Sequence, residues 1–225
     1  MTNSEIIEET ITFVKETLKN AEGGHDWFHI QRVFNNTMLI AKEEGVNILV
    51  VSLGALLHDI ADAKFNDGDE SLGPKMAEKF LLSICVPKRT INHVTNIIKY
   101  SSFKTGLTDG KMKKKLFSSN ELNVVQDADR LDAIGAIGIA RAFNYGGFKN
   151  RALYDPNIPP NLEMTKEEYK KSSGPTLNHF YEKLLLLKDK MNTETGKRLA
   201  EQRHQYMIDF LEQFYQEWNP LKNLT

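Results

Sequence analysis

The sequence predicts an all-α fold, and three observations lead to this prediction. Apolar residues recur at intervals of three and four over most of the chain, a spacing typical of amphipathic helices. Residues 48–57 are apolar around nearly their whole circumference, which indicates a helix surrounded by other helices. The C-terminal part carries two further apolar stripes, both rich in aromatic residues, at the same helical spacing.

The N-terminal helices are predicted from stripes of apolar residues at helical spacing and from the glycines that separate them. The first stripe consists of Ile7, Ile11, Val14 and Leu18, and the second of Ile30, Val33, Phe34, Thr37 and Ala41. Gly23 and Gly24 separate them, so the second helix begins near His25 or Asp26 and ends at Gly45. Residues 48–51 alone would also suit a short strand. A helix over residues 48–62 is favoured because the run continues through Ala55, Leu56 and Leu57, beyond usual strand length.

Further helices are expected at residues 76–83, 87–101 and 122–143, with loop composition at 103–119 and 145–173. Two C-terminal helices, expected as an antiparallel pair, carry Leu177, Phe180, Tyr181, Leu184, Leu187 and Met191, then Leu199, Tyr206, Phe210, Phe214 and Trp218. We therefore expect a helical core over residues 1–145. Residues 146–225 would form an irregular connection and a C-terminal helical pair packed on that core.

Composition narrows the classes of function. The charged fraction is 26% and the formal net charge is -1 over 225 residues, which argues against a general affinity for nucleic acid. Lys111, Lys113, Lys114 and Lys115 are interpreted as part of a surface loop. The longest apolar run is about half of the roughly 20 residues that cross a bilayer, so no membrane span is expected. A single cysteine, Cys85, and a start without an apolar leader favour the cytoplasm.

Histidines and aspartates interrupt three otherwise apolar helices. His58 and Asp59 follow a buried run, where polar groups lose hydration unless a hydrogen-bonded partner or a cation compensates. His25 and His29 lie one turn apart on the preceding helix. On a later helix the interruptions are Asp127, Asp129 and Asp132. Helical bundles build metal sites by bringing such groups together, although these residues alone also allow a structural pair.

These motifs, taken in order, resemble the HD-domain metal-dependent phosphohydrolases. His29, then His58-Asp59, then Asp129 within Asp127-Ala128-Asp129-Arg130-Leu131 match the H…HD…D signature, and the resemblance covers roughly residues 23–145. The residues that flank these motifs are similar to those of a bacterial subgroup of small HD hydrolases with a C-terminal helical extension. The resemblance implies an HD-domain helical bundle with His29, His58, Asp59 and Asp129 as metal ligands. Asp127 and Asp132 are rivals to Asp129, whose sequence context fits the family best.

The resemblance also implies the chemistry. Two imidazoles and two carboxylates suit one divalent transition metal, foremost Mn²⁺, with Fe²⁺, Ni²⁺, Zn²⁺ and Mg²⁺ as alternatives, and they leave positions for water and a phosphoryl oxygen. Asp62 is the candidate general base, one turn after His58. Lys64 is a candidate catalytic and substrate-binding cation, with Arg141, His25 and Arg32 as further substrate-binding groups. His93, without a second nearby histidine in sequence, is interpreted as a hydrogen-bonded helix residue.

The family resemblance implies a Mn²⁺-dependent pyrophosphohydrolase of nucleoside or deoxynucleoside triphosphates, with a small-molecule nucleotide as its partner. A nucleoside 5′-monophosphatase would use the same ligands. A non-catalytic metal- or nucleotide-binding regulatory module is the alternative from another class, and Asp62 and Lys64 argue against it. Tyr145, Phe148 and Tyr154 are candidates to stack on a base. The apolar C-terminal helices would also suit a homodimer interface.

Overall fold

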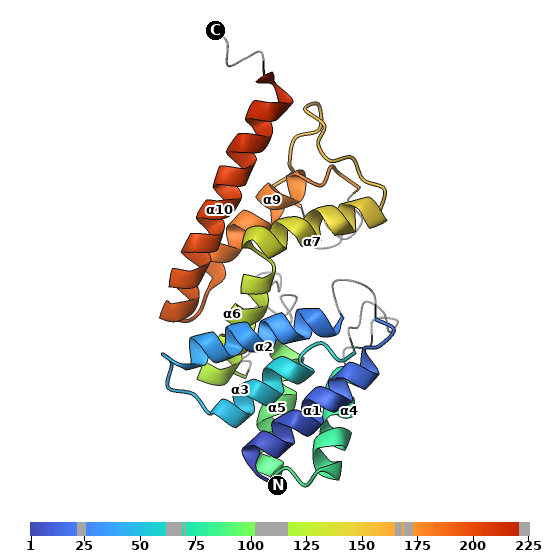
Figure 1. The fold of residues 1–225 in the computed structure, drawn as a ribbon, viewed down its shortest axis with the longest axis vertical. Helices are drawn as coiled ribbons and strands as arrows, with labels where there is room; N and C mark the ends of the chain where they lie inside the picture. The colour runs from blue at the N-terminus through green and yellow to red at the C-terminus, as the bar shows by residue number, and fades with distance from the viewer. Residues whose placement is uncertain are drawn as a thin grey trace. The chain divides into compact units, whose positions relative to one another are not determined.

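A computed structural model describes residues 1–21, 26–61, 69, 71–101, 117–164, 168 and 173–220. Over these residues the regular structure consists of helices, without a strand, which confirms the predicted all-α class (Figure 1). The chain forms two compact units, Met1–Asp129 and Arg130–Thr225, called here the N-terminal and the C-terminal unit. A domain boundary between residues 145 and 146 stays a prediction from the sequence.

The N-terminal unit is a helical bundle arranged around one buried helix. Its helices are α1 (Asn3–Thr17), α2 (Trp27–Ala41), α3 (Ile48–Leu57), α4 (Leu72–Ser83), α5 (Lys88–Ser101) and most of α6 (Asn120–Asp132). Helix α3 packs against α1, α2 and α5, and α4 packs against α5 (Figure 1). The apolar circumference of α3 is therefore matched by neighbours, and the strand alternative for residues 48–51 is wrong.

Helix α3 is stabilised by a side-chain cap at its first turn and by close packing along its length. The Asn47 side chain accepts a hydrogen bond from the Val50 backbone at 3.1 Å and so caps the first turn. Leu53, Leu56 and Leu57 are fully buried, and truncating one such leucine typically costs about 2–5 kcal/mol of stability. A Cβ added at Gly54 would lie 3.1 Å from Ile97 of α5. Helix α3 thus lies close against α5, and it ends immediately before His58.

The C-terminal unit holds the end of α6, then α7 (Gly135–Phe148), α9 (Asn178–Glu182), the 3-10 helix η3 (Leu184–Lys190) and α10 (Glu194–Trp218). Helix α10 packs against both α7 and η3. Aromatic rings fill this unit: Phe180 stacks on Phe210 with ring centroids 5.9 Å apart, and Tyr154 contacts Trp218 edge-on at 5.1 Å. Phe210 and Phe214 of the predicted aromatic stripe are half-buried in these ring contacts, whereas Tyr206 and Trp218 stay largely exposed, and the apolar residues that α10 buries are Ala200, Met207 and Leu211.

Two predicted helices of the C-terminal half are wrong in detail. Residues 122–143 form two helices, because Ile134 is extended and Gly135 adopts a left-handed φ of 74° between α6 and α7. The predicted helix over residues 177–191 is the short α9 followed by η3, separated at Lys183, whose φ is -146°. In a 3-10 helix residues i and i+3 align, which explains why Leu184 and Leu187 are both buried there.

The other predicted helices are confirmed with shifted ends. Helix α4 begins at Leu72, one turn earlier than predicted, and α2 ends at Ala41, before Gly45. Helix α3 ends at Leu57, and residues 58–61 form a turn. The predicted continuation of the helix is therefore wrong for these four residues, and residue 62 lies outside the described residues. Residues 103–116 of the predicted loop lie outside the described residues. Within the described ranges, no helix is both long and apolar enough to cross a membrane.

Candidate metal centre

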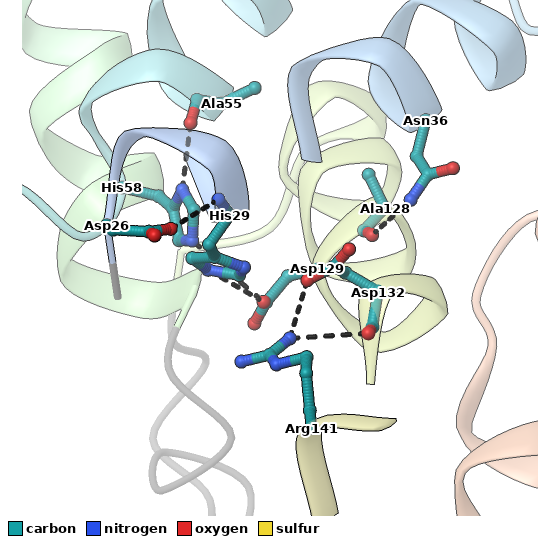
Figure 2. Close-up of polar contacts among 9 residues, drawn as sticks. All are labelled: Asp26, His29, Asn36, Ala55, His58, Ala128, Asp129, Asp132 and Arg141. Carbon is teal, nitrogen blue, oxygen red and sulfur yellow. Dashed lines mark hydrogen bonds and ion pairs between the residues drawn. The ribbon is translucent and has the colours of Figure 1, made fainter. Parts of the chain in front are cut away.

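His58 is held in one orientation at the end of α3. It is the first residue after the helix, where the last carbonyl groups have no partner within the helix. Its ring nitrogen Nδ1 lies 2.8 Å from the Ala55 carbonyl oxygen, and because a carbonyl only accepts, Nδ1 carries the proton and donates. In the neutral ring the lone pair is then on Nε2, the atom on the side of Asp129 (Figure 2).

His29 approaches from the first turn of α2. The Asp26 side chain caps this helix by accepting a hydrogen bond from the His29 backbone at 3.0 Å, which fixes where the helix begins. The His29 side chain is 2% exposed. Its ring meets the His58 ring edge-on, with centroids 5.4 Å apart and planes at 67°. Two imidazoles from different helices thus share one buried location.

Asp129 of α6 faces both histidines. Its Oδ1 lies 3.7 Å from Nε2 of His29 and 3.9 Å from Nε2 of His58 (Figure 2). The rival Asp127 is fully buried, and Asp132 is paired with Arg141. The contacts of Asp129 therefore favour the assignment that its sequence context suggests.

Asp59 lies close to the two histidines. Among the described residues, His29, His58 and Asp59 form a group whose ligand atoms all lie within 4.8 Å of one another and could hold a metal ion. Helix α2, the residues after α3, and helix α6 each contribute to this location. The buried helix α3 thus brings His58 and Asp59, which directly follow it, to the same place as His29.

The spacing of these groups fits a shared ion better than direct hydrogen bonds. Hydrogen bonds between nitrogen and oxygen are about 2.7–3.2 Å long, and both contacts of Asp129 are longer. Two ligand atoms about 2.1 Å from one ion are about 3.0 Å apart at a right angle and about 4.2 Å apart on opposite sides. The distances of 3.7 and 3.9 Å lie inside this range. The mixed nitrogen and oxygen donors also suit a transition metal.

Two residues that the sequence did not single out tie α6 to its neighbours. Asn36, buried on α2, donates from Nδ2 to the Ala128 carbonyl oxygen at 3.3 Å, next to Asp129 (Figure 2). Gln126 donates from Nε2 to the Tyr100 carbonyl oxygen of α5 at 2.8 Å. A signal for Asn36 was present, because it is a polar residue on the apolar face of α2. The carbonyl it would bond was not predictable from helical periodicity.

The other predicted site residues are placed as follows. His25, Asp62 and Lys64 lie outside the described residues, so their roles stay predictions. Arg32 is half-buried on α2, one turn after His29. Arg141 pairs with Asp132 at 2.5 Å. Arg130 and Arg141 lie on the separate helices α6 and α7, and not on the single helix predicted over residues 122–143.

His93 is a hydrogen-bonded helix residue, as predicted. Its Nε2 lies 3.0 Å from the Ser119 hydroxyl and 3.5 Å from the Glu121 carboxylate. The Ser119 hydroxyl also accepts from the Leu122 backbone at 3.0 Å and so caps the start of α6. Serine and glutamate approach the same ring nitrogen, which is not the arrangement of a nucleophile, base and orienting acid.

Comparison with known proteins identifies the family. The HD domain family matches residues 27–134, the span that contains all four candidate ligands. A crystal structure of an HD-superfamily hydrolase from Bacillus thuringiensis is 45% identical, covers 97% of this chain and 99% of its own, and superposes with a TM-score of 0.76. This chain belongs to the HD superfamily. As an HD protein it is a metal-dependent phosphohydrolase.

Two further comparisons concern one relative. The uncharacterized protein YpgQ from Bacillus subtilis is 37% identical over 206 residues, covering 92% of this chain and 90% of its own. A crystal structure of YpgQ in complex with ADP covers 96% of this chain and 97% of that one, at 34% identity and a TM-score of 0.75. The likeness extends beyond the HD domain of residues 27–134 to nearly the whole chain.

Proposed function

We propose that this HD protein is a nucleoside or deoxynucleoside triphosphate pyrophosphohydrolase that uses one Mn²⁺ ion held by His29, His58, Asp59 and Asp129. The observation that carries the proposal is the convergence of both Nε2 atoms and Asp129 Oδ1 at the spacing of a shared ion. The orientation of His58 supports it, because Nδ1 is already bonded to Ala55 and Nε2 is left as donor.

The ADP complex of YpgQ supports a nucleotide as the substrate class. The ion, when bound, would lower the pKa of a coordinated water and neutralise charge on a phosphoryl group. Asp62 would accept the proton of the attacking water. Lys64, with His25, Arg32 and Arg141, would contact the phosphate oxygens and offset their charge. Cleavage between the α and β phosphates would then release a nucleoside monophosphate and pyrophosphate.

A panel of nucleoside and deoxynucleoside triphosphates, assayed with Mn²⁺ and with chelator, tests this function. Orthophosphate is detected with and without added inorganic pyrophosphatase. We expect release that requires both Mn²⁺ and the pyrophosphatase. Release without pyrophosphatase, seen with nucleoside 5′-monophosphates, would identify a monophosphatase instead. No Mn²⁺-dependent release from any nucleotide would make the pyrophosphohydrolase assignment wrong.

Matched variants test the metal ligands. We expect Asp59→Ala and Asp129→Ala to lose Mn²⁺ binding and turnover, while Asp209→Ala, an exposed aspartate on α10 that bonds Gln205, leaves both unchanged. Retention of metal in Asp129→Ala, with loss in Asp127→Ala, would move the fourth ligand to Asp127. Nucleotide binding by Asp59→Ala, together with a parent that turns nothing over, would favour the regulatory module.

A further inference from the structure

The residues of α6 that directly follow Asp129 make three arginine contacts within the C-terminal unit. Arg203 of α10 donates from Nη1 to the Leu131 carbonyl oxygen at 2.5 Å. Arg141 of α7 pairs through Nη1 with Oδ2 of Asp132 at 2.5 Å and reaches its carbonyl oxygen at 3.3 Å (Figure 2). Arg130 donates to the Lys190 carbonyl oxygen at 2.7 Å.

Asp132 is the charged centre of this network. It is 1% exposed, and a carboxylate buried to this degree needs paired charge to remain ionised. Burial lowers the pKa of the Arg203 guanidinium, and the charge of Asp132 acts in the opposite direction. The two half-buried arginines and the buried carboxylate therefore stabilise one another, and removing an arginine leaves the charge of Asp132 without full compensation.

Gly135 makes room for the arginine that reaches this turn. Its φ of 74° is open to glycine and strained for other residues. A Cβ built there would lie 3.0 Å from Cβ of Arg203 and 3.1 Å from its Cγ. The turn after α6 is also tight, since the backbones of Ala133 and Ile134 bond the carbonyls of Arg130 and Leu131 three residues earlier. The stem of Arg203 thus packs on the turn that ends α6.

This anchoring acts where a helix is ordinarily weakest. The last four carbonyl groups of a helix have no partner within it, and helix ends open more readily than their centres. Asp129 is the first residue of that last turn, and the network follows it at positions 131 and 132. A frayed turn would let the Asp129 carboxylate leave the position 3.7 and 3.9 Å from the two histidines.

We infer that Asp132 and Arg203 are positioning residues, which hold the end of α6 so that Asp129 keeps its carboxylate in place for the metal. The inference rests on the proposed role of Asp129 as a ligand. Neither residue touches the ion or the substrate in this role. Asp132 and Arg203 lower the free energy needed to order the Asp129 carboxylate. A substitution of either residue should therefore weaken the affinity for the metal.

Titration of the full-length protein with Mn²⁺, followed by electron paramagnetic resonance, tests this inference. We expect Arg203→Met, which keeps an apolar stem but removes the donor, and the isosteric Asp132→Asn to raise the Mn²⁺ dissociation constant about 10- to 100-fold. Lys197→Met is the control on the same helix, because Lys197 is exposed and pairs with Glu194. It should stay within about twofold of the parent.

Two readouts separate positioning from general loss of stability. Arg203→Lys keeps a donor and a charge, so it should recover much of the affinity lost in Arg203→Met. Excess Mn²⁺ should restore the turnover of Arg203→Met, whose four ligands are intact, but not that of Asp129→Ala. Thermal melts identify folded variants, and if Arg203→Met does not unfold cooperatively, Asp132→Asn decides the question.

The outcomes also separate this inference from the function it rests on. If the parent binds no Mn²⁺, or Asp129→Ala binds it normally, the proposed metal site is wrong. If Asp129→Ala loses Mn²⁺ while folded Asp132→Asn and Arg203→Met bind it as tightly as the parent, only the positioning role is overturned. A Lys197→Met variant that weakens Mn²⁺ binding equally would also overturn it.

Discussion

The Ala55 carbonyl oxygen lies 2.8 Å from Nδ1 of His58 and holds the imidazole with Nε2 turned toward His29 and Asp129. The acceptor belongs to the last turn of α3, so the helix end itself orients the ring. No second side chain is needed to select the tautomer. The first prediction follows from this contact.

We predict that the neutral imidazole of His58 carries its proton on Nδ1 in the metal-free protein. Long-range proton–nitrogen correlation spectra of the imidazole rings should show a protonated Nδ1 and an unprotonated Nε2 for this residue, assigned by comparison with His58→Ala. Addition of a diamagnetic divalent ion such as Zn²⁺ should shift the Nε2 signal. A His58 ring with the proton on Nε2 would contradict the geometry.

The Asn36 hydrogen bond to Ala128 leads to the second prediction. Asn36→Leu keeps the size of the side chain but leaves the buried carbonyl of Ala128 without this donor. We expect the free energy of unfolding to fall by about 1–3 kcal/mol and Mn²⁺ to bind more weakly. Urea denaturation and metal titration measure both. Asn35→Leu, at the exposed neighbouring position, should change neither by a comparable amount.

Gly135 provides a third prediction. Gly135→Ala forces a side chain into a left-handed conformation and against Arg203, and should lower the free energy of unfolding by at least about 1 kcal/mol. The matched control is Gly147→Ala in α7, where an added Cβ meets nothing within 4 Å. That variant should be neutral or stabilising by up to about 1 kcal/mol. Equal urea midpoints for the two variants would argue against the strain.

His179 makes the stability depend on pH. Burial, strengthened by the charges of Lys183 and Arg151, lowers the pKa of His179 from 6.5 to about 3. Between these values the unfolded chain binds a proton at this residue and the folded chain does not. Unfolding is therefore favoured as the pH falls from about 6.5 toward 3, by up to about 1.4 kcal/mol per pH unit.

We expect His179→Gln, which cannot titrate, to show a flatter pH profile than the parent in that window. Urea denaturation at several pH values between 4 and 7 measures both slopes. The two proteins should have parallel profiles above about pH 7, where His179 is neutral in the folded and the unfolded chain. Parallel profiles below pH 6 as well would contradict the lowered pKa.

Particular residues show how far the sequence predicts the site. His29, His58 and Asp59 lie together as expected. His29 lies on the buried face of α2, and His58 and Asp59 directly follow the buried helix α3. The choice among Asp127, Asp129 and Asp132 needed family resemblance, since all three lie within two turns of one helix. The structure favours Asp129 through its distances to the two histidines.

The sequence predictions that are wrong have two physical causes. The helix over residues 122–143 is broken at Gly135, where a conformation open to glycine coincides with the stem of Arg203, 68 positions later. The same network gives Arg141 the partner Asp132. In residues 177–191 the apolar spacing of Leu184 and Leu187 fits both an α-helix and a 3-10 helix, so periodicity could not distinguish them.

The sequence by itself determined the all-α class, the buried α3 and the residue types that converge beside it, because helical periodicity and hydration cost are local properties of the chain. Only the tertiary structure decided which aspartate faces the histidines, which tautomer His58 adopts and which arginines hold the end of α6. Those features depend on backbone carbonyls and buried charges that residues distant in sequence bring together. Hydrophobic spacing carries no information about them.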